Sequence, residues 1–343
     1  MIISNYTRRE KMKKKVCVLT LGGTIAYTRD AEEGVIQDLQ PFIKSLDEVS
    51  EIAEVDTISF MKSSSSALLI KDIINLSVKI KSLIEEGYEG FVVIQGTDTI
   101  EETAFILQLI MDTDIPIIVT GAMRNPDMRG ADGPANILAS IRVAANNNCR
   151  GLGTLVVFND EIHSGYFVRK IHPQSTEAFG SEFSLLGYLA EGIPSIRLKP
   201  IERRIPYINL VTDDVPDVHL YSVPIGDDGK LLTKYLDFEY KGLVLEGLGG
   251  GHTPTELVDS LEEIAKEMPV ILSTRIGVGD TLTSTYTGYP GSEISLLSKG
   301  LISAGFLDGR RSRILLTLLL MSDCNLEEIK DAFKIFSKCY NRY

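Results

Sequence analysis

Short apolar runs alternate with longer amphipathic segments along most of this chain, and this alternation limits the folds that it can adopt. Amphipathic segments such as 69–87 and 133–147 have the apolar spacing of helices. Several apolar runs are continuous, as is typical of parallel strands buried on both faces. Repetition of strand, helix and strand predicts an α/β fold with a parallel sheet covered by helices. The expected strands cover residues 15–21, 91–95, 115–121, 152–159, 218–225, 242–248 and 268–275.

The length of 343 residues is more than one hydrophobic core usually serves, which favours two domains. The pattern lapses between residues 192 and 217, where four prolines and mixed charges interrupt it. We therefore expect a basic tail over 1–14, an N-terminal α/β catalytic domain over 15–191, a connection over 192–217 and a smaller α/β domain over 218–343.

Composition excludes several classes of protein. The formal net charge of −12 argues against nucleic acid as a partner, because phosphate binding needs clustered Lys and Arg. No stretch approaches the roughly 20 apolar residues that cross a bilayer, and the apolar run 16–21 is short for a signal peptide. These features predict a cytoplasmic protein that does not bind membranes. The four cysteines and four histidines lack ligand spacing, so neither metal nor cofactor is expected.

The segments that follow the predicted strands are where chemistry is expected, because ligands of parallel sheets bind beyond the carboxyl ends of the strands. In LGGTIA (21–26), Gly22 and Gly23 permit a close approach of backbone or ligand, and Thr24 then presents a hydroxyl. The glycine spacing does not match a dinucleotide fingerprint, and no Walker lysine follows.

The stretch QGTDT (95–99) combines a helix signal with two unexplained polar residues. Thr99 and Glu102 match a capping box, in which Thr99 is the N-cap. Thr97 and Asp98 lie just before this helix N-terminus, where free N–H groups favour negative charge. Turn chemistry and a functional site explain these two residues equally well.

Lys170, in VRKIHPQS, is either a solvated surface lysine or a base drawn into a polar cleft. Residues of the long segment after 115–121 have the same ambiguity, namely Arg124, Arg129 and Asp132. The motifs of serine hydrolases and zinc peptidases are absent from the sequence. If the chain is a hydrolase, a threonine is the best candidate for its nucleophile.

Taken together, four stretches resemble the bacterial-type L-asparaginase family of threonine amidohydrolases: LGGTIA, QGTDTIEETAF, TGAMRNPDMRGADGPAN and VFNDEIHSGYFVRK. Their order and approximate spacing match over residues 16–180, and GLGGGHTP and PVILSTR extend the match. The resemblance implies a large doubly wound parallel-sheet N-terminal domain, a smaller flavodoxin-like C-terminal domain, and assembly as a homodimer or homotetramer.

The resemblance also implies catalytic roles by position. Thr24 matches the nucleophile that attacks the side-chain amide, and Thr97, Lys170 and Asp98 match the triad that handles protons. Asp98 would in addition bind the α-amino group of the substrate. The matched reaction is the hydrolysis of L-asparagine to L-aspartate and ammonia through an acyl-enzyme on Thr24.

Four further positions are expected to bind the substrate. A serine of SSSS (63–66) should contact the α-carboxylate, and counting from the following helix favours Ser65. The carbonyl of Ala122 should hold the leaving amide, and backbone N–H groups of the glycine loops should stabilise the oxyanion. The expected substrate-binding residues are Gly23, Ser65, Gly96 and Ala122.

Two positions depart from the family pattern. The family's mobile loop supplies a tyrosine, but residues 28–87 contain none. The family's C-terminal acidic residue has only Asp280 and Glu293 as candidates. These departures leave two alternatives open: the same chemistry on another amide, such as glutamine, a peptide or a specialised metabolite, or a non-catalytic protein that binds an amino acid.

Overall fold

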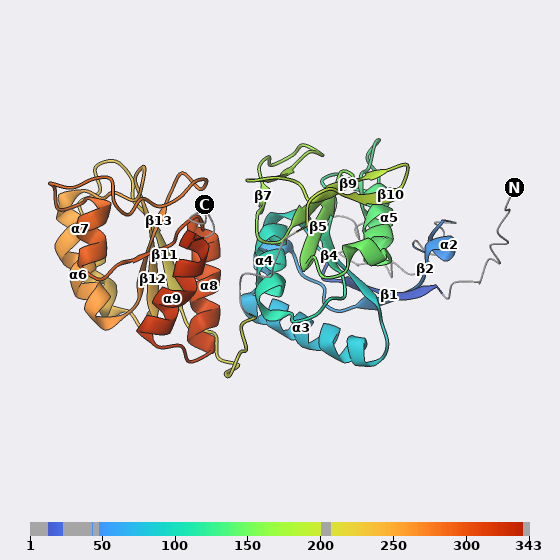
Figure 1. The fold of residues 1–343 in the computed structure, drawn as a ribbon, viewed down its shortest axis with the longest axis horizontal. Helices are drawn as coiled ribbons and strands as arrows, with labels where there is room; N and C mark the ends of the chain where they lie inside the picture. The colour runs from blue at the N-terminus through green and yellow to red at the C-terminus, as the bar shows by residue number, and fades with distance from the viewer. Residues whose placement is uncertain (1–12, 23–42, 44–47, 200–206, 339–343) are drawn as a thin grey trace, which may run out of the picture. The chain divides into compact units, whose positions relative to one another are not determined.

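The computed structural model describes residues 13–22, 43, 48–199 and 207–338. The chain divides into two compact units, Met1–Ile201 and Glu202–Tyr343, and each is built on its own sheet (Figure 1).

The N-terminal unit is built on an eight-stranded sheet in the order β10-β9-β6-β5-β4-β3-β1-β2. Neighbouring strands from β5 to β2 are parallel, whereas β6, β9 and β10 extend the sheet in antiparallel pairs. A separate two-stranded sheet pairs β7 with β8. The bounds are β1 Lys14–Thr20, β2 Ala53–Ser59, β3 Gly90–Ile94, β4 Ile117–Thr120, β5 Thr154–Phe158, β6 Glu161–Ser164, β7 Val168–Lys170, β8 Phe179–Ser181, β9 Gly187–Ala190 and β10 Ile193–Ile196.

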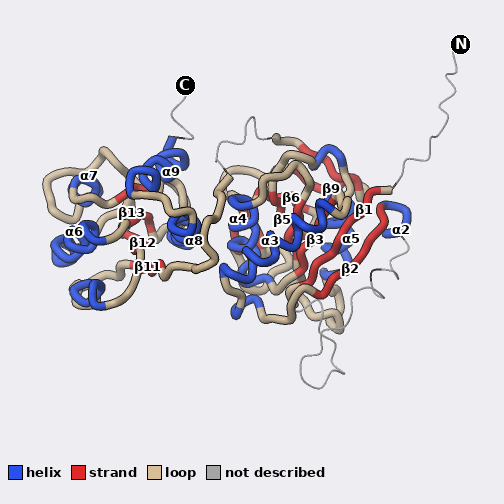
Figure 2. The backbone as a smooth tube through the Cα atoms, turned by 90° about the horizontal axis from the view of Figure 1, so that it is seen from below, coloured by secondary structure: helices blue, strands red, loops and turns tan. Residues whose placement is uncertain are grey.

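Helices cover both faces of the parallel part of this sheet, as Figures 1 and 2 show. Helix α5 packs its apolar face on one side, where Ile137 and Ile141 join a buried cluster with Val92 and Ile118. Helices α3 and α4 pack against each other on the opposite face. Strands β3, β4 and β5 are wholly buried because helices cover them on both sides. The helices are α2 Val49–Ile52, α3 Ile70–Glu85, α4 Ile100–Ile110 and α5 Gly133–Ala144.

The C-terminal unit contains a four-stranded parallel sheet in the sequential order β11-β12-β13-β14. Helices α6 and α7 lie on one face, and α8 and α9 on the other (Figure 1). Its core includes the fully buried Leu243, Leu245, Leu261 and Leu272. The bounds are β11 Val218–Ser222, β12 Gly242–Gly247, α6 Val258–Glu267, β13 Val270–Thr274, α7 Glu293–Ser298, β14 Ile302–Ser303, α8 Gly309–Met321 and α9 Leu326–Lys338.

The structure confirms the predicted α/β class, with a large parallel-rich sheet in one unit and a smaller parallel sheet in the other. Each predicted strand and both named helical segments are present, with ends that differ by a few residues. The expected connection over 192–217 stays a prediction, although its first residues form β10, which pairs with β9. No helix among the described residues is long and apolar enough to cross a membrane.

Candidate active site

Two glycines at strand ends hold a short serine turn between them. The serine turn, residues 63–67, follows β2 and includes the 3-10 turn η2 (Ser65–Ala67). A Cβ on Gly22, whose φ is +112°, would lie 2.3 Å from the carbonyl oxygen of Ser63. A Cβ on Gly96 would lie 2.5 Å from the Ser65 hydroxyl. Only glycine lets the ends of β1 and β3 approach the serine turn this closely, so Gly22 and Gly96 place Ser65 at the carboxyl edge of the sheet.

Thr97 and Asp98 lie at the same edge, in the 3-10 turn η3 (Thr97–Thr99) that joins β3 to helix α4. Thr99 is the N-cap of α4, as predicted, but its side chain makes no capping hydrogen bond. Its hydroxyl instead donates to the carbonyl oxygen of Ser65 at 3.1 Å and accepts from Gln95 Nε2 at 3.2 Å. The predicted capping-box role is therefore wrong for Thr99, because the carbonyl oxygen of Ser65 lies within reach and accepts from its hydroxyl.

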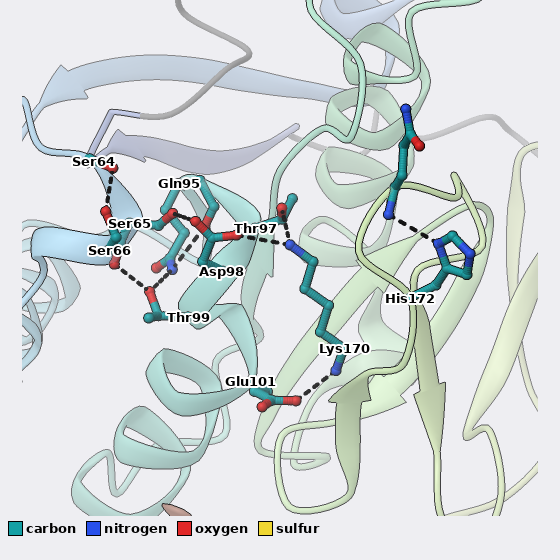
Figure 3. Close-up of polar contacts among 12 residues, drawn as sticks. Ser64, Ser65, Ser66, Gln95, Thr97, Asp98, Thr99, Glu101, Lys170 and His172 are labelled. Carbon is teal, nitrogen blue, oxygen red and sulfur yellow. Dashed lines mark hydrogen bonds and ion pairs between the residues drawn. The ribbon is translucent and has the colours of Figure 1, made fainter.

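Lys170, at the end of β7, extends to the two residues of η3 (Figure 3). Its Nζ donates to Thr97 Oγ1 at 2.8 Å and to Asp98 Oδ1 at 3.0 Å. The other carboxylate oxygen of Asp98 accepts from the Ser65 hydroxyl at 3.1 Å. Four predicted site residues from three separate segments thus form one hydrogen-bonded cluster: Ser65, Thr97, Asp98 and Lys170.

The charges in this cluster keep Asp98 ionised. The hydrogen bond from Lys170 lowers the pKa of the Asp98 carboxyl, and the bond from Ser65 adds to this effect against a smaller opposing effect of burial. The Lys170 side chain is largely buried, whereas that of Asp98 is 61% exposed. An ionised carboxylate that faces solvent beside a lysine can bind a cationic group of a ligand.

The main chain of Lys170 is also held. Its backbone N–H donates to Glu101 Oε2 at 2.6 Å. Glu101 is in the first turn of α4, and the residue is only 4% exposed. The sequence patterns did not single out Glu101, because the capping box points to its neighbour Glu102. The available signal was a second acidic residue, beside Glu102, at the start of a mostly apolar helix.

The segment after β4 brings Ala122 to the same edge. A Cβ on Gly121 would lie 2.5 Å from the Gln95 carbonyl oxygen and 3.2 Å from Thr97 Cγ2, so the residue before Ala122 packs against the start of η3. Ala122 itself is buried.

The polar residues of α5 and of the preceding loop brace this segment. The Asp132 carboxylate accepts from the backbone N–H groups of Met123 and Arg124, at 3.0 and 2.9 Å. The amide of the buried Asn136 donates to the Gly121 carbonyl oxygen at 3.0 Å. The Arg124 guanidinium donates to the Gly130 carbonyl oxygen. The contacts of Asp132 and Arg124 therefore serve the loop itself.

Some of the expected site residues fall in a part of the chain that the structure does not describe. Gly23 and Thr24 lie outside the described residues, and so does Tyr27. Gly22, the last described residue before them, contacts the serine turn. Among the described residues, no group of three or more His, Cys, Asp or Glu side chains is arranged to hold a metal ion.

The two acidic candidates of the C-terminal unit differ in their surroundings. Glu293 is fully buried and accepts from the backbone N–H groups of Thr285 and Tyr286, at 2.9 and 2.6 Å. Burial acts to raise the pKa of Glu293, but these backbone hydrogen bonds outweigh it and lower the pKa. Its other oxygen lies 3.1 Å from His252 Nε2. The Glu293 carboxylate therefore stabilises the loop that precedes α7. For Asp280, burial raises the pKa of the carboxyl group.

Comparisons with known proteins identify the family to which this chain belongs. Residues 15–202 match the family model "Asparaginase, N-terminal", and residues 217–333 match "Glutaminase/Asparaginase C-terminal domain". The chain belongs to the asparaginase family. It is 30% identical to an L-asparaginase of Bacillus licheniformis over 94% of this chain and 99% of the relative. It is 28% identical to a glutaminase-asparaginase of Acinetobacter glutaminasificans over 94% of this chain and 99% of the relative.

A solved structure has the same fold. The crystal structure of a probable cytoplasmic L-asparaginase from Campylobacter jejuni matches with a TM-score of 0.84 and 29% identity, over 94% of this chain and 99% of that one. These matches confirm the resemblance that the sequence motifs indicated. This asparaginase-family protein is accordingly an enzyme, an amidohydrolase of the asparaginase type.

Proposed function

We propose that this protein hydrolyses the side-chain amide of L-asparagine to L-aspartate and ammonia. The observation that carries the proposal is the contact of Lys170 Nζ with both Thr97 Oγ1 and Asp98 Oδ1, at 2.8 and 3.0 Å. A lysine that hydrogen-bonds a hydroxyl and pairs with a carboxylate can pass protons during hydrolysis. A non-catalytic amino-acid sensor has no need of such a lysine.

The proposed reaction begins with attack by the Thr24 hydroxyl on the carbon of the side-chain amide. A hydroxyl is a weak nucleophile unless a base accepts its proton, and the pair of Thr97 and Lys170 serves as the proton relay. The proton passes to the leaving nitrogen, the C–N bond breaks, and ammonia departs from an acyl-enzyme on Thr24. Water then attacks the ester carbon, which releases aspartate and restores the Thr24 hydroxyl.

The proposed binding mode uses the remaining residues of the cluster. Asp98 binds the α-amino group through its exposed carboxylate, and Ser65 beside it binds the α-carboxylate, so adjacent groups recognise the two charged groups on the α-carbon of an amino acid. Backbone N–H groups of Gly23 and Gly96 stabilise the negative oxygen of the tetrahedral intermediate, and the Ala122 carbonyl accepts from the leaving amide.

Measurement of ammonia release tests this function. The wild-type protein should release ammonia from L-asparagine, and Lys170→Met should lower kcat/KM by about 10³-fold, since it removes the proton relay. Thr24→Ala should abolish acyl-enzyme formation. Lys230→Met, which removes an exposed lysine of the C-terminal unit, should leave activity unchanged. Turnover in Lys170→Met equal to that of the wild type would refute the assigned roles.

Glutamine is the second candidate substrate. Relatives from Acinetobacter glutaminasificans and Pseudomonas fluorescens are named glutaminase-asparaginase. A panel of asparagine, glutamine, asparaginyl peptides and other primary amides should give the highest kcat/KM for asparagine. A higher value for glutamine or a peptide would move the proposal to that substrate, with the chemistry unchanged.

The same proposal extends to setting and assembly. We expect a cytoplasmic enzyme that requires no cofactor or metal and acts on a small-molecule amide, without nucleic acid or membrane as a partner. We also expect a homodimer or homotetramer. Light scattering after size exclusion should then give two or four times the 37.8 kDa mass of the chain.

A further inference from the structure

Lys170 is held at both ends, and the two anchors lie within five residues of each other in the sequence. Its Nζ contacts Thr97 and Asp98, whereas its backbone N–H donates to Glu101 Oε2 at 2.6 Å. Figure 3 shows the lysine extending from Glu101 at one end to Thr97 and Asp98 at the other. The turn η3 thus binds the ammonium group of Lys170, and the first turn of α4 binds its backbone N–H.

The strand that carries Lys170 does not belong to the main sheet. Strand β7 has three residues and pairs with β8 in a separate two-stranded sheet. A lysine side chain has four rotatable bonds, so the position of its Nζ depends first on where its main chain is fixed. The distance from the main chain of Lys170 to Thr97 therefore depends on how β7 is held to the main body of the unit.

Helix α4 contacts β7 and is itself well fixed. Every residue of α4 except Glu102 is buried, and the helix continues directly from η3. The chain that leads into β7 also packs closely on this helix, since a Cβ on Gly165 would lie 2.9 Å from the Ala104 carbonyl oxygen. The Glu101 carboxylate then fixes the last residue of the strand through a short, charge-assisted hydrogen bond.

We infer that Glu101 is a positioning residue for the reaction. It sets the distance between Lys170 Nζ and Thr97 Oγ1 by holding the main chain of Lys170 to helix α4, which continues directly from the turn that carries Thr97. The inference rests on the proposed function for its catalytic consequence. A displacement of about 1 Å in a catalytic group can lower a rate by about 10²-fold, so the loss of this anchor acts on kcat. Glu101 touches no reacting atom.

Three variants separate this role from general stabilisation of the helix. Glu101→Met keeps the length of the side chain and removes the acceptor. Glu101→Gln keeps an oxygen that can accept from the same N–H. Glu102→Met is the matched control, because it removes an acidic residue from the same helical turn. For each variant, kcat and KM for asparagine, the thermal unfolding temperature and a crystal structure are measured.

Glu101→Met should lower kcat by about 10- to 100-fold with KM within about threefold of wild type, and should lengthen the distance from Lys170 Nζ to Thr97 Oγ1 beyond 3.5 Å. Glu101→Gln should restore kcat to within about threefold, and Glu102→Met should match the wild type. Equal losses in both methionine variants, in parallel with their unfolding temperatures, would show a merely structural role and overturn the inference. An unchanged lysine geometry in Glu101→Met would also overturn it.

The crystal structures keep this inference separate from the proposed function. If the wild type released no ammonia from any amide, the proposed function would fail. The lysine geometry in Glu101→Met would still show whether Glu101 sets the position of Lys170.

Discussion

At the scale of single residues, the side chains of three neighbours in sequence contact Lys170 and Ser65 in different combinations. Thr97 accepts from Lys170, Asp98 pairs with Lys170 and accepts from Ser65, and Thr99 donates to the carbonyl oxygen of Ser65. The 3-10 turn that carries them directs successive side chains to different sides. One turn therefore joins the serine turn on one side to the lysine on the other.

A buried histidine of the N-terminal unit gives the protein a pH-dependent stability. His163 is fully buried in β6, with Nδ1 at 2.9 Å from Ser181 Oγ and Nε2 at 3.4 Å from Glu161 Oε2. Burial lowers the pKa of His163 to about 4, from about 6.5 in an unfolded chain. The unfolded state therefore binds the extra proton between these values, so stability falls as the pH falls from 6.5 towards 4.

We predict that His163→Gln, which cannot titrate, loses less stability in acid than the wild type. Between pH 7 and pH 4, the unfolding free energy of the wild type should fall by up to about 3 kcal/mol more than that of the variant. Urea unfolding of both proteins at several pH values measures this shift. A difference that stays constant with pH would contradict a lowered pKa.

At the scale of elements, the site depends on how closely the serine turn approaches the end of β3. Gly96 has a φ of −66°, which any residue can adopt, so its glycine is required by space and not by backbone strain. The hydroxyl and Cβ of Ser65 lie 2.5 and 2.9 Å from the position where a Cβ on Gly96 would be. A side chain at position 96 must therefore displace Ser65.

Gly96→Ala should move Ser65 away from Asp98 and break their 3.1 Å hydrogen bond. We expect KM for the amide substrate to rise at least about tenfold, the equivalent of about 1.4 kcal/mol, because the proposed carboxylate and amine sites separate. Steady-state kinetics measures the change. Gly226→Ala is a control outside the site, where an added Cβ meets no atom within 4 Å but φ is +76°. It should lower stability with KM unchanged, and equal KM values in Gly96→Ala and wild type would count against the proposed binding mode.

At the scale of the whole molecule, each unit has a sheet and a hydrophobic core of its own. The cluster around Val92 and Ile118 belongs to the N-terminal unit, and that around Leu245 and Leu272 to the C-terminal unit. Cores formed by separate parts of a chain can unfold separately, because each core is stabilised by contacts within its own part.

Leu272→Ala should reveal this division. Leu272 is fully buried in β13, so the truncation should lower the unfolding free energy of the C-terminal unit by about 2–5 kcal/mol. Hydrogen exchange followed by mass spectrometry should show faster exchange in β11, β12 and β13, with β1, β3 and β4 unchanged. Leu272→Met, which conserves volume, should have a much smaller effect. Equal acceleration in both units would show that they unfold as one.

Much of the fold could be predicted because the signals were local. The continuous apolar runs around Val92, Ile118 and Val156 predicted buried parallel strands, and the structure confirms them. Strand β2 was not predicted, because its burial is uneven and its charged residues weaken the pattern. Strands β6 to β10 are short, three or four residues each, and their positions depend on pairing across the sheet. Such pairing has little local signature.

The sequence by itself determined the fold class, the order of the strand-end loops and, through the resemblance of four motifs, the chemical class of the enzyme. Apolar periodicity and turn chemistry act between near neighbours, so they can be read along the chain. The contacts of Thr99 with Ser65 and of Glu101 with Lys170 join residues 34 and 69 positions apart. Only the tertiary structure decided these, because hydrogen bonds go to the partner that folding brings within about 3 Å, and no local pattern records that partner.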